Sequence, residues 1–124
     1  MSAARRIVAA LVAVVAGGSN AASPPPLNAG LHAAELCVAT LPRPASCGPA
    51  KVELRADGSM RLRIDDIAYT LTLHSSQVDV IVMHNIVQID GFSAPYEWLG
   101  RTLQFVDGER RARYEVRFPP PAAR

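Results

Sequence analysis

The sequence lacks the motifs that by themselves assign a reaction. It has no C-x-x-C pair, no glycine-bracketed serine and no histidines at a metal-ligand spacing. Nothing in it therefore supports redox, serine-hydrolase or metal chemistry, and we expect no enzymatic activity, no metal site and no cofactor. The longest apolar run, Ile7–Ala16, is too short for a membrane-spanning helix, which needs about 20 residues. We expect no stable membrane insertion of the mature chain.

The chain also lacks an excess of charge of one sign once its N-terminal segment is set aside. Lys and Arg together number 13, and Asp and Glu together number 11. Removal of Arg5 and Arg6 leaves 11 cations against 11 anions. A formally neutral domain has little electrostatic attraction for phosphates, so we expect no nucleic-acid partner.

Residues 1–22 have the pattern of a removable signal peptide. Two arginines precede the apolar run Ile7–Ala16, and small residues follow it. A positive region, an apolar region and small residues in this order are typical of signal peptidase substrates. The sequence predicts cleavage after Ala21, or after Ala22, and a periplasmic or secreted protein.

Proline gathers at the two edges of the mature chain. Three consecutive prolines begin at Pro24, and three more begin at Pro119. Such segments cannot join the interior of a sheet or helix. We expect a Pro-rich leader over 23–30, a single β domain over 31–118 and a Pro-rich tail over 119–124.

Cys37 and Cys47 are the only two cysteines. An exported chain reaches an oxidising compartment, where an even number of cysteines normally pairs. We therefore expect one disulfide between them, which staples a proline-bearing loop to the start of the sheet.

Two alternating segments predict a β-hairpin over 51–64. Apolar residues alternate with charged ones on both sides of a central Asp-Gly turn, which is a hairpin signal. A three-residue loop places Leu54 opposite Met60 and Glu53 opposite Arg61, whereas a two-residue turn would set Leu54 against Arg61. The pattern favours the longer loop.

Other segments carry weaker signals. The apolar residues occupy even positions before Asp65-Asp66 and odd positions after it. A bulge or a tight turn is therefore expected there. The run Val78–Met83 is apolar on both faces apart from one aspartate, which is typical of a central strand covered on both sides. A further strand is expected over about 86–89. Leu31–Leu41 has apolar residues at helical spacing and leaves a short N-terminal helix open.

The last predicted element is a hairpin around Asp107-Gly108. A two-residue turn there pairs Leu103 with Ala112. One strand face then carries the larger apolar side chains Phe105, Tyr114, Val116 and Phe118. The fold class expected from all segments is mainly β: a small antiparallel meander of about six or seven strands, closed as a barrel or a sandwich.

The segment Gly91–Gly100 contains the candidate recognition residues. It shows no strand period, is bounded by glycines and holds Phe92, Tyr96 and Trp98. Aromatic side chains in such a loop serve as anchors for a partner, or they fold back and plug the end of a small barrel. The sequence leaves both interpretations open.

Arginines line two of the predicted strand faces. Arg61 and Arg63 lie on one, and Arg111, Arg113 and Arg117 lie on the other. Acidic residues are interleaved with both groups, so the pattern favours a self-compensating surface. Binding of an acidic partner or a carbohydrate phosphate is the alternative.

One resemblance to a known family accompanies these patterns. The stretch Ser59–Ile64, continued by Tyr69–Leu73, resembles the central strands of the membrane-bound or periplasmic inhibitors of c-type lysozyme, which are small exported barrels. The Ser-Gly-x-x-Tyr loop by which those inhibitors reach the lysozyme active site has no counterpart here. We expect a non-enzymatic binding module of the cell envelope, with a protein or an envelope component as partner. The alternative is an inhibitor or immunity-type protein that acts on a secreted hydrolase such as lysozyme.

Overall fold

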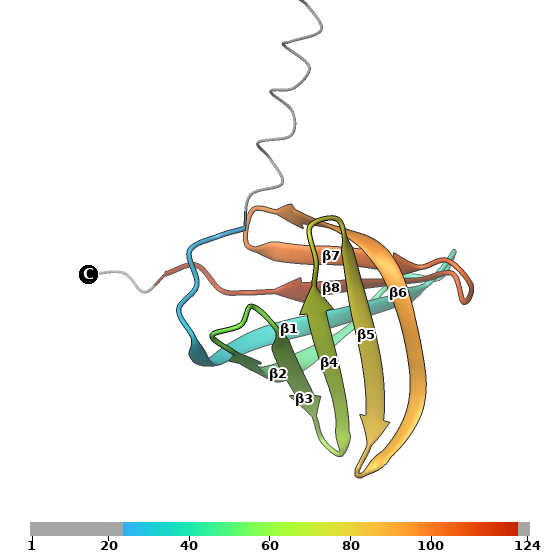
Figure 1. The fold of residues 1–124 in the computed structure, drawn as a ribbon. Helices are drawn as coiled ribbons and strands as arrows, with labels where there is room; N and C mark the ends of the chain where they lie inside the picture. Colours follow the sequence, from blue (N-terminus) through green and yellow to red (C-terminus); the bar gives the residue numbers. More distant parts are fainter. Residues whose placement is uncertain (1–23, 122–124) are drawn as a thin grey trace, which may run out of the picture.

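Eight antiparallel strands, each paired with its neighbours in chain order, close on themselves in the computed structural model, which describes residues 24–121 (Figure 1). They are β1 (Gly30–Thr40), β2 (Ser46–Leu54), β3 (Met60–Ile64), β4 (Ile67–Leu73), β5 (Gln77–His84), β6 (Val87–Leu99), β7 (Thr102–Asp107) and β8 (Ala112–Arg117). The mainly β class is confirmed, as a barrel with eight strands rather than six or seven. The predicted signal peptide lies outside the described residues.

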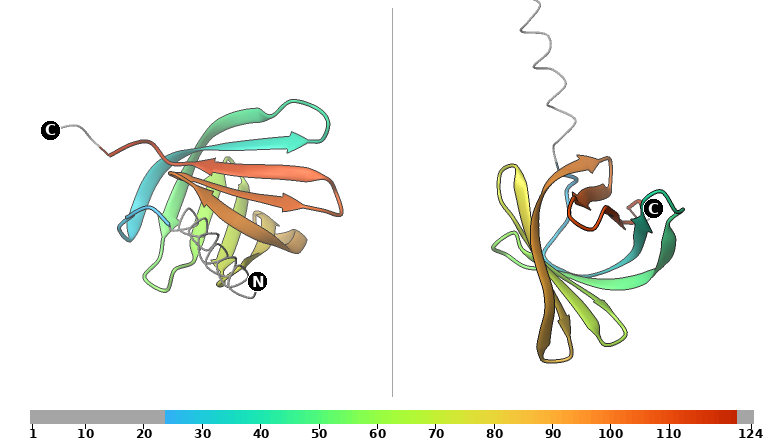
Figure 2. Two further views of the ribbon diagram at one scale, coloured as in Figure 1. Left: turned by 90° about the horizontal axis from the view of Figure 1, so that it is seen from above. Right: turned by 90° about the vertical axis from the view of Figure 1, so that its right-hand side faces the viewer.

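The long strand β6 joins two groups of strands that run in different directions. It pairs with β5 as far as Pro95 and then with β7 through Tyr96–Leu99. In Figure 1, β3, β4 and β5 run across the direction of β7, β8 and β1, and Figure 2 shows β6 bending from one group to the other. A sheet needs such tilt and bending to close into a small barrel.

The N-terminal segment is a strand, so the short helix left open over Leu31–Leu41 is wrong. Residues of β1 pair with β2 along almost their whole length, and Glu35–Thr40 pair with β8 as well. Without this strand the barrel would have a gap between β2 and β8. Pairing with two distant strands outweighs the weak helical spacing, because tertiary contacts override a local pattern this short.

The interior of the barrel is filled by alternate side chains of the strands. The large residues with less than 2 % exposure are Leu62, Leu71, Leu103, Val52, Val78, Val80 and Val116. Phe105 stacks on Tyr114 with ring centroids 5.1 Å apart, and Phe92 lies 5.6 Å from Tyr114. An eight-stranded barrel is just wide enough for such side chains to fill it.

The first hairpin follows the predicted register. Leu54 pairs with Met60 and Glu53 with Arg61, and the turn contains Gly58 at a φ of 91°, a conformation that favours glycine. A tight turn lies at Asp65-Asp66, as expected, because Ile64 already pairs with Ile67.

The last hairpin has a different register from the predicted one. Leu103 pairs with Val116, and the strand pairing ends at Asp107–Ala112. The buried Asp107 carboxylate accepts hydrogen bonds from the amides of Glu109 and Arg110, which fixes a longer turn than the two residues expected. The shift is by four residues, an even number, so the predicted apolar face still points into the barrel.

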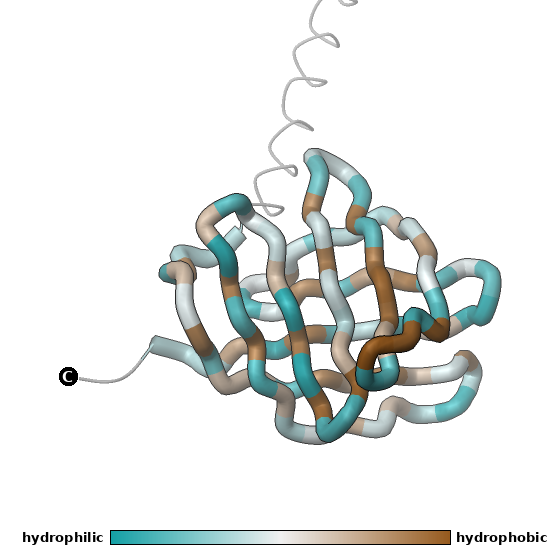
Figure 3. The backbone as a smooth tube through the Cα atoms, turned by 60° about the horizontal axis from the view of Figure 1, so that its bottom comes forward, coloured by the Kyte–Doolittle hydropathy of each residue, from teal (hydrophilic) through white to brown (hydrophobic). Residues whose placement is uncertain are grey.

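Strand β5 is covered on one face only, which corrects the prediction for Val78–Met83. Val78, Val80 and Val82 are buried, whereas Ile81 is 41 % exposed on the outside. The following turn and the start of β6 are also apolar and exposed, at Ile86 and Val87, and this part of the chain is brown in Figure 3. A β-branched residue such as Ile81 favours a strand by its backbone preference alone. Apolar character on both faces of a strand therefore does not prove that both faces are covered.

The Pro-rich leader lies against one end of the barrel. Leu27 packs against the core, and the Asn28 carbonyl oxygen lies 2.7 Å from the Nε2 atom of His32. The His32 ring meets the Phe118 ring edge-on, with centroids 6.2 Å apart. No helix among the described residues is long and apolar enough to cross a membrane.

The predicted disulfide is present. Cys37 of β1 and Cys47 of β2 are directly opposite each other, with Cα atoms 4.0 Å apart. A disulfide between strands is consistent with an oxidising compartment.

Candidate functional site

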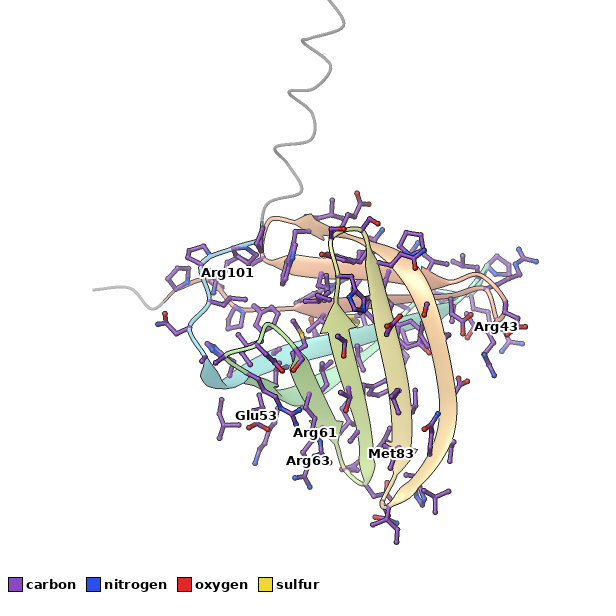
Figure 4. The ribbon with its side chains drawn as sticks, in the orientation of Figure 1. Arg43, Glu53, Arg61, Arg63, Met83 and Arg101 are labelled. Carbon is purple, nitrogen blue, oxygen red and sulfur yellow. A yellow bond between two sulfur atoms is a disulfide. The ribbon has the colours of Figure 1, made fainter. Side chains whose placement is uncertain are left out.

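A groove of about 930 Å³ lies on the outside of the barrel where β2 and β3 separate. We call it the β2–β3 groove. Its lining residues are Leu31, Ala33, Ala34, Gly48, Pro49, Ala50, Lys51, Glu53, Arg61, Arg63, Ile64 and Asp65. Figure 4 shows Glu53, Arg61 and Arg63 together along this side of the molecule, and Arg43 far from them at the other end of the β1–β2 hairpin.

The groove exists because β2 and β3 pair over only a short length. Their ladder runs from Leu54–Met60 to Lys51–Arg63, so residues 46–50 of β2 continue past the end of β3. Several side chains at this separation are small, among them Ala33, Ala34 and Ala50, and Gly48 has none. Among residues 24–121, no atom lies within 4 Å of a Cβ atom placed on Gly48, so this part of the described chain leaves the backbone open to a ligand.

Two rows of outward-facing residues run across β1, β2 and β3. The pairing aligns Leu31 with Glu53 and Arg61 in one row. It aligns Ala33 with Lys51 and Arg63 in the next row. Lys51 and Arg63 are therefore directly opposite, and like charges in this position destabilise a sheet.

The three cations of the groove have no ionic partner within 4.0 Å in residues 24–121. The same holds for the two carboxylates of the groove, those of Glu53 and Asp65. The Nε atom of Arg61 is also buried without a hydrogen-bond partner. Buried donors are nearly always satisfied in folded proteins, so the guanidinium of Arg61 has unused capacity for an acceptor.

The arginines of β8, unlike the cations of the groove, lie close to carboxylates. Arg117 lies 2.6 Å from Glu115 and 3.5 Å from Glu35, and Arg113 lies 3.8 Å from Glu115. These carboxylates raise the pKa of Arg117. The predicted self-compensating surface is thus found as close ion pairs on β8, whereas in the β2–β3 groove Glu53 lies opposite Arg61 without an ion pair within 4.0 Å.

The other polar clusters hold turns and strands together. The Ser93 hydroxyl donates to Asp79 at 2.6 Å, and a ring nitrogen of His74 lies 2.9 Å from the same carboxyl group. These bonds lower the pKa of Asp79. At the other end of the β4–β5 hairpin, His84 lies 2.8 Å from Asp66. Each histidine is thus bonded within its own cluster, and the two are not brought together.

One group of three potential metal-ligating side chains occurs in the described part of the chain: Glu35, Cys37 and Cys47. Both sulfurs are bonded to each other. A disulfide sulfur is not the thiolate that binds metal ions, so this group supports no metal site.

The candidate recognition residues lie in a strand and not in a loop, which corrects the sequence interpretation of Gly91–Gly100. Phe92, Tyr96 and Trp98 belong to β6 and point into the barrel. Trp98 is only 5 % exposed and its ring centroid is 6.2 Å from that of Phe118. This position matches the interpretation in which aromatic residues plug the barrel.

Tyr96 and Trp98 also line a hollow of about 370 Å³ beneath the leader, whose other side is formed by Pro24, Pro25 and Leu27. The Tyr96 hydroxyl donates to the His74 carbonyl oxygen and is thereby held in place. The leader therefore covers the aromatic end of the barrel, while the β2–β3 groove stays uncovered by it.

Sequence reasoning missed the groove although a signal for it was present. The register that sets Leu54 opposite Met60 also sets Lys51 opposite Arg63, three pairs further along the same ladder. A like-charged pair at this position was the available signal. The separation of the strands beyond it depends on barrel closure, which no local pattern contains.

Comparison of the chain with protein-family models, with curated proteins and with solved structures found no match.

Proposed function

We propose that this protein is an exported, non-enzymatic binding module of the cell envelope, periplasmic or secreted, and that its β2–β3 groove binds an anionic group of its partner. The signal-peptide pattern and the disulfide support export. The volume of the groove, about 930 Å³, is within the range of pockets that hold small molecules.

The observation that carries this proposal is the opposition of Lys51 and Arg63 with no carboxylate within 4.0 Å of either in the described chain. Arg61 is two residues from Arg63 in the same strand, so its side chain is on the same face. The folded protein keeps the directly opposed pair Lys51 and Arg63 at a cost in stability, with Arg61 as a third cation beside them. An anion between them removes that cost and forms charge-assisted hydrogen bonds with the guanidinium groups.

Charge reversal at Lys51 tests the proposal because it has opposite effects on stability and on binding. Lys51→Glu replaces the repulsion from Arg63 by an attraction, so we expect the free energy of unfolding to rise by about 0.2–1 kcal/mol. Binding of inorganic phosphate should be lost. The matched control is Arg43→Glu, which makes the same charge change far from the groove (Figure 4).

The assay is the thermal midpoint in phosphate and in chloride at equal ionic strength. A bound anion at free concentration c stabilises the folded state by RT ln(1 + c/Kd) and so raises the midpoint, whereas the general stabilising effect of phosphate acts on every variant alike. We expect phosphate to raise the thermal midpoint of the wild type and of Arg43→Glu by more than it raises that of Lys51→Glu. An equal rise in all three proteins would overturn the proposal.

The inhibitor alternative predicts a different result. A protein that blocks a secreted hydrolase should lower the activity of c-type lysozyme at equimolar concentration. The groove is concave, whereas insertion into an enzyme cleft needs a protruding segment, so the geometry favours a ligand-binding role. Inhibition of lysozyme that survives Lys51→Glu would assign the function to another surface.

A further inference from the structure

The β2–β3 groove has an apolar side next to its cations. Leu31 is 80 % exposed and lies in the same row as Glu53 and Arg61. Ala33, in the next row, is exposed as well. Ala34, Ala50 and Ile64 also line the groove, but they belong to the inward face: Ala50 is 6 % exposed, and Ala34 and Ile64 pack against the core. An exposed leucine is common by itself, but here two exposed apolar side chains of β1 lie beside a charged groove.

The hollowed surface continues along β1 beyond the groove. Ala33 and Ala34 also line a second hollow, of about 320 Å³, together with Phe118, Pro119 and the charged residues Glu35 and Arg117. Arg117 lies 3.5 Å from Glu35, so the charges of this second hollow are paired with each other. A chain that starts at the cations of the groove therefore has room to extend along β1 past Ala33.

Addition of a peptide strand fits this place poorly. The part of β2 that extends past β3 contains Pro49, which has no backbone N–H to donate. Proline on an exposed strand edge hinders pairing with another strand. The partner is thus expected to use side-chain contacts rather than a β-ladder.

The charges of the groove also restrict the anion. Lys51, Arg61 and Arg63 stand against Glu53 and Asp65, so three cations face two carboxylates. A long polyanion would meet those carboxylates, whereas one phosphate or carboxylate group can lie between the cations alone.

We propose that the β2–β3 groove binds a single anionic amphiphile, with its head group between Lys51, Arg61 and Arg63 and its alkyl chain along Leu31 and Ala33. This inference rests on the proposed anion-binding function and adds the class of ligand. The ligand binds as one molecule, because the site is a groove of about 930 Å³ rather than a flat surface that rests on a bilayer.

A series of alkyl phosphates tests the inference. Hexyl, octyl and decyl phosphate, each below its critical micelle concentration, should bind with an affinity that rises about fourfold for each methylene buried, which corresponds to about 0.8 kcal/mol per CH₂. Inorganic phosphate supplies the charge alone, and octyl glucoside supplies the chain alone. We expect both to bind more weakly than octyl phosphate.

Two variants locate the head group and the chain. Leu31→Gln should flatten the dependence on chain length and leave phosphate binding unchanged. Lys51→Glu should weaken every member of the series. The control for Leu31→Gln is Leu99→Gln, since Leu99 is another exposed leucine, at 49 %, and is not part of the groove.

The possible results separate the two proposals. Binding of phosphate with no gain from longer chains would refute the amphiphile and leave the proposed function intact. No binding of phosphate or of any alkyl phosphate would refute both. A chain-length dependence that Leu31→Gln leaves unchanged would refute this location, and binding to anionic phospholipid vesicles without binding to the monomers would show a membrane-docking surface instead.

Discussion

Replacement of Trp98 by alanine distinguishes a core role from a recognition role for the aromatic end of the barrel. The side chain is 5 % exposed and packs beside Phe118. Truncation of a buried Trp costs about 3–5 kcal/mol, from lost apolar burial and the cavity left behind. A domain of this size has a free energy of unfolding of about 5–15 kcal/mol, so Trp98→Ala should remove a large part of it.

Urea unfolding followed by far-ultraviolet circular dichroism measures this loss without the tryptophan signal. With a urea slope near 2 kcal/mol/M, the midpoint should fall by about 2 M. Trp98→Phe keeps most of the buried area and should show a smaller decrease, which provides a measurable variant if Trp98→Ala does not fold. Leu99→Ala, the neighbouring exposed position, is the control and should change stability by about 0.5 kcal/mol or less.

If Trp98→Ala lowers the free energy of unfolding by only about 0.5 kcal/mol or less, the core assignment is refuted. It would also restore Trp98 as a candidate anchor for a partner. Because Trp98 is the only tryptophan in the chain, the emission of the wild type gives an independent check: a buried indole should emit at shorter wavelength than an exposed one.

Two further predictions concern the disulfide and the buried tyrosine. Reduction of Cys37–Cys47, or the double change to serine, should lower the free energy of unfolding by about 2–3 kcal/mol, and equal urea midpoints with and without reductant would contradict this. Burial raises the pKa of Tyr114 to about 12. Since this folded-state pKa lies above the unfolded value near 10, the contribution of Tyr114 to stability is complete below pH 10 and is lost as the pH rises through about 12. Tyr114→Phe should reduce this alkaline loss, which stability measurements across that range will show; tyrosinate absorbance of the wild type that appears entirely near pH 10 would disprove the raised pKa.

The sequence by itself determined the local features of this protein. Alternation and turn residues predicted the β2–β3 hairpin, including the pairing of Leu54 with Met60. The two cysteines predicted the disulfide. The inward face of β7 and β8 was also predicted despite a wrong register, because a shift by an even number of residues leaves side chains on the same face. These features depend on residues close together in the chain.

Only the tertiary structure decided the features that depend on closure of the barrel. Leu31–Leu41 has apolar residues at helical spacing but lies mostly in the strand β1, because β1 pairs with both β2 and β8. Val78–Met83 carries apolar residues on both faces, yet within residues 24–121 the outward-facing Ile81 stays 41 % exposed. The β2–β3 groove arises where two strands of unequal length separate. Among residues 24–121, Lys51, Arg61 and Arg63 have no carboxylate within 4.0 Å, whereas Arg113 and Arg117 of β8 do. Spacing in the sequence was similar in both arginine groups, and their different pairing follows from contacts between strands distant in the chain.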